Sequence, residues 1–102
     1  SVRGAVSALS LSNVFFIVKK LSNGEKGYRA LEALVRLFDV IEVGPKTIRK
    51  ALEARFPDFE DAIQYYAALK FRAQAIVSRD PSGFAEGKIP VMDCAQFLAQ
   101  WE

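Results

Sequence analysis

The chain has 102 residues, of which 51% are apolar and 25% are charged, and its formal net charge is +2. This length allows one domain with a modest core, and the composition is that of a globular protein rather than a disordered or fibrous one. The sequence contains no histidine, which excludes Ser-His-Asp and Cys-His nucleophile relays and histidine-ligated metal sites. Its single cysteine, Cys94, excludes an internal disulfide framework.

The sequence also bears on where the protein acts. No apolar run approaches the length that a membrane-spanning helix needs, and the N-terminus lacks a basic-then-apolar signal pattern. We therefore expect a cytoplasmic location and no membrane partner. The small net charge does not by itself indicate a nucleic-acid partner.

The first predicted elements are a short buried strand over residues 4–9 and a helix that ends near Leu21. Ser10 or Ser12 is the expected N-cap of this helix. Its apolar residues fall on two sides, so we expect one side to pack in the core and the other against a second subunit.

A loop is predicted over residues 22–27 and an amphipathic helix over residues 28–38. The apolar positions of this helix that should face inward are Leu31, Leu34, Val35 and Phe38.

The second half of the chain continues the alternation of strands and helices. The expected elements are a strand over 39–43, helices over 45–55 and 58–72, a strand over 75–78, a turn over 80–83, an extended segment over 89–91 and a helix from Asp93 to about Trp101. This alternation predicts an α/β fold with three layers, in which helices cover both faces of a parallel sheet. We expect a single domain over residues 1–102.

Two aspartates are the best candidates for chemistry. Ligands of open parallel sheets bind beyond the carboxyl ends of the strands, and Asp80 follows the strand that ends at Ser78. Asp61 lies in the first turn of the preceding predicted helix. If the two carboxylates meet, they repel each other unless a cation intervenes, and Mg²⁺ or Mn²⁺ would suit such oxygen ligands.

Each aspartate also has a purely structural interpretation. Asp58 as N-cap with Asp61 at the third helical position is a capping arrangement that the helix dipole favours. The sequence Asp80-Pro-Ser-Gly83 equally suits a type I turn. Both interpretations stay open at the level of the sequence.

Several segments together resemble the PIN domain, and most closely the VapC-like toxins of prokaryotic toxin–antitoxin pairs. They are residues 58–64, residues 67–69, residues 73–80 with Phe84 and residues 89–91, and upstream residues 6–13, which are similar to the family's second strand and the helix after it. The resemblance covers essentially the whole chain. It implies an endoribonuclease that depends on Mg²⁺ or Mn²⁺ and uses three or four acidic residues.

The resemblance assigns roles to particular residues. Asp61 matches the family's third acid and Asp80 the fourth, so both are expected metal ligands and catalytic residues. The second acid falls at or near Asn13, an amide that binds metal more weakly. The first acid and its central strand have no counterpart, so we expect the chain to be the C-terminal three quarters of the family's domain, with weak or no activity. The alternative is a degenerate PIN-like module that binds an antitoxin or forms a homodimer.

Other residues are candidates for RNA contacts near this site. Arg79 and Arg72 could neutralise phosphates, and Ser78 could orient a metal-bound water or simply end its strand. Lys46, Arg49 and Lys50 share one helix face, which is either a phosphate-binding surface or an ordinary solvated one.

Overall fold

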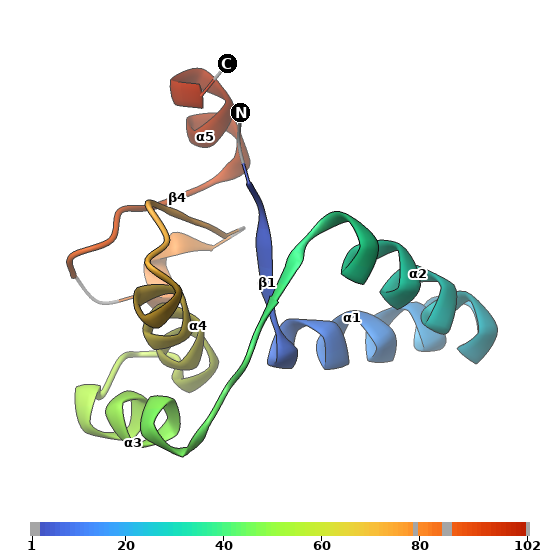
Figure 1. Cartoon of the computed structure of the whole chain (residues 1–102), viewed down its shortest axis with the longest axis horizontal. Coiled ribbons are helices and arrows are strands. Elements are labelled where there is room, and N and C mark those ends of the chain that lie inside the picture. The colour runs from blue at the N-terminus through green and yellow to red at the C-terminus, as the bar shows by residue number, and fades with distance from the viewer. Residues whose placement is uncertain (1–2, 79, 85–86, 102) are drawn as a thin grey trace. The chain divides into compact units, whose positions relative to one another are not determined.

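The computed structural model describes residues 3–78, 80–84 and 87–101 (Figure 1). Within these residues it has five α-helices and two pairs of short parallel strands. The α/β class and the parallel strand direction predicted from the sequence are therefore confirmed. The contacts divide the chain into two compact units, Ser1–Val43 and Gly44–Glu102, and each unit holds one strand pair. That the whole chain acts as a single domain stays a prediction.

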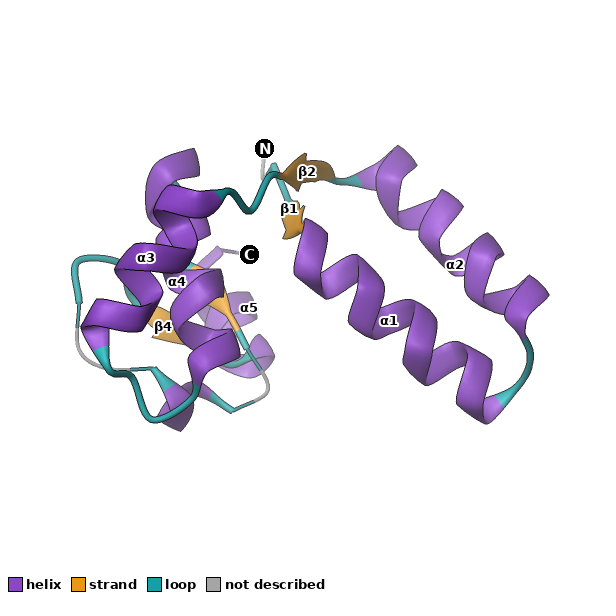
Figure 2. Cartoon of the chain, turned by 90° about the horizontal axis from the view of Figure 1, so that it is seen from below, coloured by secondary structure: helices purple, strands orange, loops and turns teal. Residues whose placement is uncertain are grey.

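The first unit is a helical hairpin framed by two strands. Its elements are β1 (Ala5–Ser7), α1 (Ala8–Leu21), α2 (Gly24–Leu37) and β2 (Asp39–Ile41). The two helices lie side by side and run in opposite directions (Figure 2). The strands pair in parallel, with Ala5 opposite Asp39.

Both helices of the first unit begin earlier than the sequence analysis predicted. The N-cap of α1 is Ser7, whose Oγ accepts a hydrogen bond from the backbone N–H of Ser10 over 3.1 Å, so the predicted caps at Ser10 and Ser12 are wrong. The predicted loop over residues 22–27 is also wrong. Asn23 caps α2 instead, because its Oδ1 accepts from the N–H of Lys26 over 2.8 Å and so satisfies a donor of the first turn.

The hairpin is held together by a close approach at Gly27. A Cβ atom on this buried glycine would lie 2.9 Å from Cδ1 of Phe15, so the two helices touch where no side chain intervenes. The Phe15 ring also packs against Tyr28, with 4.8 Å between the centroids.

Much of the apolar surface of the hairpin remains open. None of the residues of α1, all of which the structure describes, is buried, and Phe16 is 74% and Leu21 82% exposed. Of the four residues predicted to face inward, Leu31 and Leu34 are partly buried, whereas Val35 and Phe38 are exposed.

The second unit is organised around a mostly buried helix. Its elements are α3 (Pro45–Ala54), α4 (Phe59–Phe71), β3 (Ile76–Val77), the 3-10 turn η1 (Pro81–Gly83), β4 (Val91–Met92) and α5 (Cys94–Trp101). α4 packs against α3, and β3 pairs in parallel with β4. Among the described residues, one core cluster consists of Tyr65, Ala68 and Ile89.

The ends of the helices in this unit follow from local chemistry. Asp58 caps α4, and Pro45 occupies the first turn of α3, where its missing N–H costs nothing. Both helices end at an arginine in the left-handed conformation, Arg55 with φ 55° and Arg72 with φ 65°. None of the helices in the described part of the chain is long and apolar enough to cross a membrane.

Candidate functional site

Asp61 is placed by the capping of α4. The Oδ1 atom of Asp58 accepts a hydrogen bond from the N–H of Asp61 over 3.0 Å and thereby fixes the point at which the helix begins. Asp61 is consequently the third residue of the helix and lies in its first turn. The cap uses the backbone of Asp61 and leaves the carboxylate for other contacts.

Asp80 is placed by the turn that follows β3. Its N–H donates to Oγ of Ser78 over 3.2 Å, and its Oδ1 accepts from the N–H of Ser82 over 3.2 Å and from the hydroxyl of Ser82. The turn is anchored to the strand pair, because the N–H of Ser78 donates to the carbonyl of Met92 over 2.9 Å. Ser78 therefore ends its strand and also positions Asp80.

The two segments meet at Gly83. A Cβ atom at Gly83 would clash with Oδ2 of Asp61 and would lie 3.3 Å from Cβ of Asp58. The Asp61 carboxylate thus packs against the turn that begins at Asp80. Only glycine permits this approach, because any side chain would displace the carboxylate.

The two carboxylates have opposite pKa shifts. Burial raises the pKa of Asp61, and the negative charges of Asp58, Asp80 and Glu60 raise it further. The hydrogen bonds from the hydroxyl and the N–H of Ser82 lower the pKa of Asp80. Asp80 therefore loses its proton first as the pH rises, and its charge then opposes the ionisation of Asp61.

The structural interpretations account for only part of this arrangement. The cap accounts for Asp58 and the turn accounts for Oδ1 of Asp80. Within the described part of the chain, the Asp61 carboxylate and Oδ2 of Asp80 accept no hydrogen bond. The Asp61 carboxylate lies against the turn of Asp80, and carboxylate oxygens are chemically suited to a hard cation.

The other predicted site residues are more dispersed. Asn13 is half-buried in α1 and belongs to the first unit, whereas the aspartate pair lies in the second. Arg72 ends α4, about 16 Å along the helix axis from Asp61 at 1.5 Å per residue. Arg79, the other predicted phosphate contact, lies outside the described residues.

Sequence reasoning missed two residues that shape the pair. Ser82 donates two hydrogen bonds to Oδ1 of Asp80, and Gly83, which has no side chain, leaves room for the Asp61 carboxylate. A serine two residues after an aspartate is a typical Asx-turn pattern and could have indicated the first role. The second depends on how α4 packs, which no local pattern reveals.

Comparison with known proteins gives one match. The sequence profile described as the PIN domain matches residues 1–82, a stretch that includes Asn13, Asp61 and Asp80. No curated protein and no solved structure matches the chain. Nuclease-type activity and dependence on divalent metal are general features of this family, and the mixed architecture with short parallel strands is consistent with its α/β/α fold. Since the match covers most of the sequence, the chain belongs to the PIN domain family.

Proposed function

We propose that this PIN domain is a metal-dependent ribonuclease of the VapC-like toxin type, which hydrolyses RNA phosphodiester bonds with Mg²⁺ or Mn²⁺ held by Asp61 and Asp80. The observation that carries the proposal is the packing of the Asp61 carboxylate against the turn of Asp80, with the pKa of Asp61 raised by burial and by neighbouring negative charges. Such a perturbed carboxylate pair is typical of functional sites.

The residues present fit a magnesium or manganese ion. Mg²⁺ is commonly bound by one or two carboxylates and keeps several waters, so a pair of aspartates is sufficient to hold it. The residues that the structure describes contain no group of three or more acidic or thiol side chains that could hold a metal ion. We therefore propose an ion bound by the two aspartates and by water. A cation here would also relieve the repulsion that raises the pKa of Asp61.

Each residue has a separate task in this proposal. A bound divalent ion supplies a water of lowered pKa and positive charge beside the phosphate. Ser82 holds Oδ1 of Asp80, which leaves Oδ2 for the metal, and Ser78 fixes the backbone of Asp80. The partial burial of Asp61 strengthens its electrostatic interaction with a cation.

The role of Asn13 rests on the family resemblance, and the roles of Arg72 and Arg79 rest on their places in the sequence. Asn13 is proposed as a weak ligand or water-orienting group, and Arg72 and Arg79 as phosphate contacts. Because Asn13 is an amide where the family has an acid, we expect the activity of this chain to be weak. Asn13→Asp should then increase Mn²⁺-dependent cleavage, since it restores a carboxylate without changing the size of the side chain.

The proposal is tested with a labelled single-stranded RNA, purified full chain, and Mn²⁺ or a chelator. Cleavage should require Mn²⁺ and should be lost in Asp61→Asn and in Asp80→Asn. Glu53→Gln is a matched control, because it removes an exposed carboxylate on α3 that is not among the charges raising the pKa of Asp61. Cleavage by Asp61→Asn at the rate of the unmodified chain would overturn the assignment.

A second candidate function is a binding module that pairs with itself or with an antitoxin. The exposed apolar side chains of α1, among them Phe16 and Ile17, favour it. Sedimentation velocity should show a dimer that Phe16→Glu converts to a monomer, while Leu52→Glu, at an exposed apolar position on α3, leaves the dimer intact. A monomer at all concentrations of the unmodified chain would exclude self-association.

A further inference from the structure

A small pocket lies between α3 and α4, separate from the aspartate pair. Its volume is about 280 Å³, near the lower end of ordinary ligand sites. The residues that line it are Lys46, Thr47, Lys50, Tyr66, Leu69 and Lys70. All of them belong to the second unit, so the pocket is formed within one compact body.

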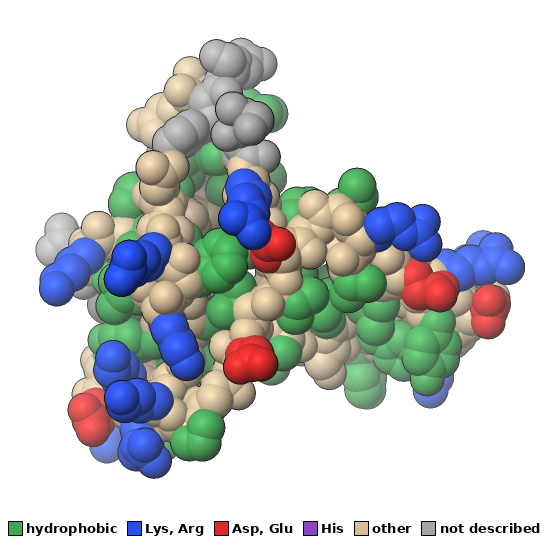
Figure 3. Space-filling view, in the orientation of Figure 1, with side chains coloured by type: hydrophobic (Ala, Val, Ile, Leu, Met, Phe, Trp, Pro, Cys, Tyr) green, Lys and Arg blue, Asp and Glu red, His purple; other side chains and the backbone are tan. Residues whose placement is uncertain are grey.

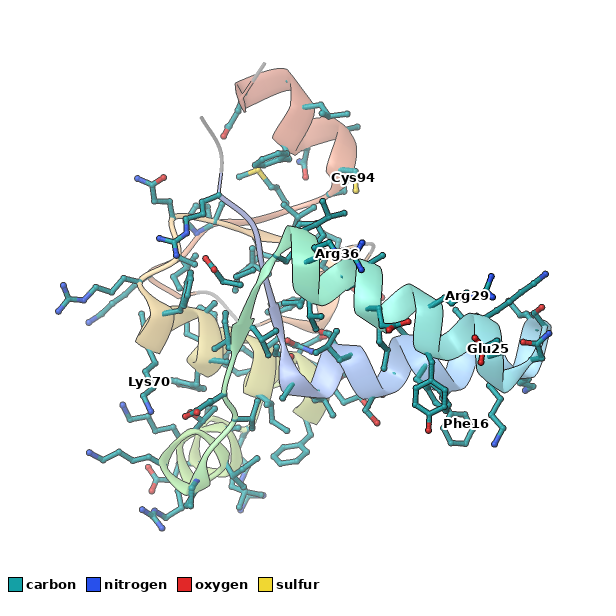
Figure 4. The ribbon with its side chains drawn as sticks, turned by 45° about the vertical axis from the view of Figure 1, so that its right-hand side comes forward. Phe16, Glu25, Arg29, Arg36, Lys70 and Cys94 are labelled. Carbon is teal, nitrogen blue, oxygen red and sulfur yellow. The ribbon has the colours of Figure 1, made fainter. Side chains whose placement is uncertain are left out.

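The pocket gathers positive charge. Lys46 and Lys50 are one turn apart on α3, and Lys70 extends from α4 toward α3 (Figure 4). Basic side chains are grouped over this part of the molecular surface (Figure 3). None of the lining residues is acidic, and none of these three lysines forms an ion pair with another described residue. Three like charges around one cavity repel each other, and an anion between them would remove that repulsion.

The apolar residues of the pocket lining are held in place by the core. Tyr66 and Leu69 pack against the buried cluster of the second unit, and Tyr66 makes an edge-on contact with Tyr65, with 5.1 Å between the ring centroids. Thr47 is only 3% exposed. A lining that combines apolar side chains packed on the core with lysines suits a ligand with an apolar part and a phosphate, such as one nucleotide of a strand.

We propose that this pocket is an RNA backbone-binding subsite in which Lys46, Lys50 and Lys70 contact phosphates. The inference rests on the proposed function, because it takes RNA to be the substrate. Tyr66 and Lys70 lie five and nine residues beyond Asp61 on α4, about 7 and 13 Å along the axis at 1.5 Å per residue. At 3.6 residues per turn they also lie on a different side of the helix from Asp61. We therefore expect the lysines to contribute to RNA affinity and the aspartates to RNA cleavage.

The test measures RNA binding without cleavage. Fluorescence anisotropy of a labelled single-stranded RNA is recorded with the full chain in EDTA at several salt concentrations. The variant is Lys46→Gln, Lys50→Gln and Lys70→Gln combined. A matched control removes three exposed lysines of the first unit, Lys19, Lys20 and Lys26, with the same change in net charge. Circular dichroism melts verify that both variants are folded.

We expect the pocket variant to bind about tenfold or more weakly at 0.1 M salt and its plot of log K against log salt to flatten by about 2, since each phosphate contact to a single strand contributes about 0.7. The control variant should change neither value to this extent. Affinity of the pocket variant equal to that of the control would overturn the proposal. Competition by polyglutamate or inorganic phosphate as effective as competition by RNA, per charge, would overturn the assignment to RNA.

The result for RNA binding by the pocket lysines can be told apart from the result for RNA cleavage by the proposed nuclease. Binding through the lysines in a chain that never cleaves RNA would leave the subsite standing and the nuclease refuted. Mn²⁺-dependent cleavage by the unmodified chain, together with unchanged RNA binding in the pocket variant, would support the nuclease and refute the subsite.

Discussion

At the scale of single residues, Asp61 and Asp80 respond to protons in opposite ways. Asp61 is partly desolvated and faces other carboxylates, whereas Asp80 receives two hydrogen bonds from Ser82. The negative charge of Asp61 therefore lowers the stability of the folded state, and the negative charge of Asp80 raises that stability. This contrast leads to two predictions of opposite sign.

Asp61→Asn is expected to raise the thermal unfolding midpoint at pH 7 in the presence of a chelator. The folded state binds a proton at Asp61 more tightly than the unfolded state, so the unmodified chain loses stability from this group as the pH rises through the raised pKa. The advantage of the variant should vanish at acid pH, where the carboxyl is protonated in both states. Circular dichroism melts across the pH range measure this, with Glu53→Gln as the control. A midpoint below that of the unmodified chain at pH 7 would contradict it.

Asp80→Ala is expected to lower the midpoint at pH 7, because Ser82 loses its acceptor. The pKa of Asp80 is lowered by folding, so its contribution is present above the ordinary aspartate range and is lost as the pH falls through the lowered value. The gap between the unmodified chain and the variant should narrow in acid. A gap that widens in acid would refute the role of the ionised carboxylate.

The sequence was sufficient to nominate these two aspartates but not to show how they approach each other. Asp58 as a cap and the turn from Asp80 to Gly83 both follow from local patterns, and the structure contains both. The contact between Asp61 and Gly83 depends on where the turn after β3 lies against α4. That position is set by packing of residues distant in the sequence.

At the scale of elements, most helices and strands could be predicted, and their boundaries less well. The run from Ser22 to Gly27 is polar and holds two glycines, which predicts a loop, yet α2 begins at Gly24. Asn23 supplies the cap, and the packing of Gly27 on Phe15 outweighs the low helix propensity of glycine. Tertiary contact therefore decided the start of this helix.

The helical hairpin offers a matched pair of substitutions. Gly27→Ala should lower the free energy of unfolding by about 1 kcal/mol, because the new methyl group meets the Phe15 ring and overpacks the contact. Gly24→Ala should be neutral or stabilising, since nothing lies within 4 Å of the position. Urea denaturation of both variants measures the difference. Equal effects of the two substitutions would show that Phe15 does not constrain Gly27.

The cap of α4 can be tested separately. Asp58→Ala should cost about 1 kcal/mol of stability through loss of the hydrogen bond to the N–H of Asp61. Asp58→Asn keeps an acceptor and should lose much less. Urea midpoints of the two variants that coincide would refute the capping role.

At the scale of the whole molecule, the sequence predicted the α/β class and the parallel strands but not the division into two compact units. Alternating apolar and amphipathic segments reveal the class. The strands have two or three residues each, and each strand pairs with the other strand of its own unit. The PIN domain match over residues 1–82 spans both units, and it includes Asn13 in the first unit and Asp61 and Asp80 in the second.

The central claim is that Asp61 and Asp80 share one divalent cation. Electron paramagnetic resonance titration of Mn²⁺ into the purified chain, which follows the loss of the free-ion signal, tests it most directly. The account predicts binding in the unmodified chain and in Glu53→Gln, and affinity lower by about tenfold or more in Asp61→Asn and in Asp80→Asn alike. Unchanged Mn²⁺ affinity in either aspartate variant would contradict a shared ion.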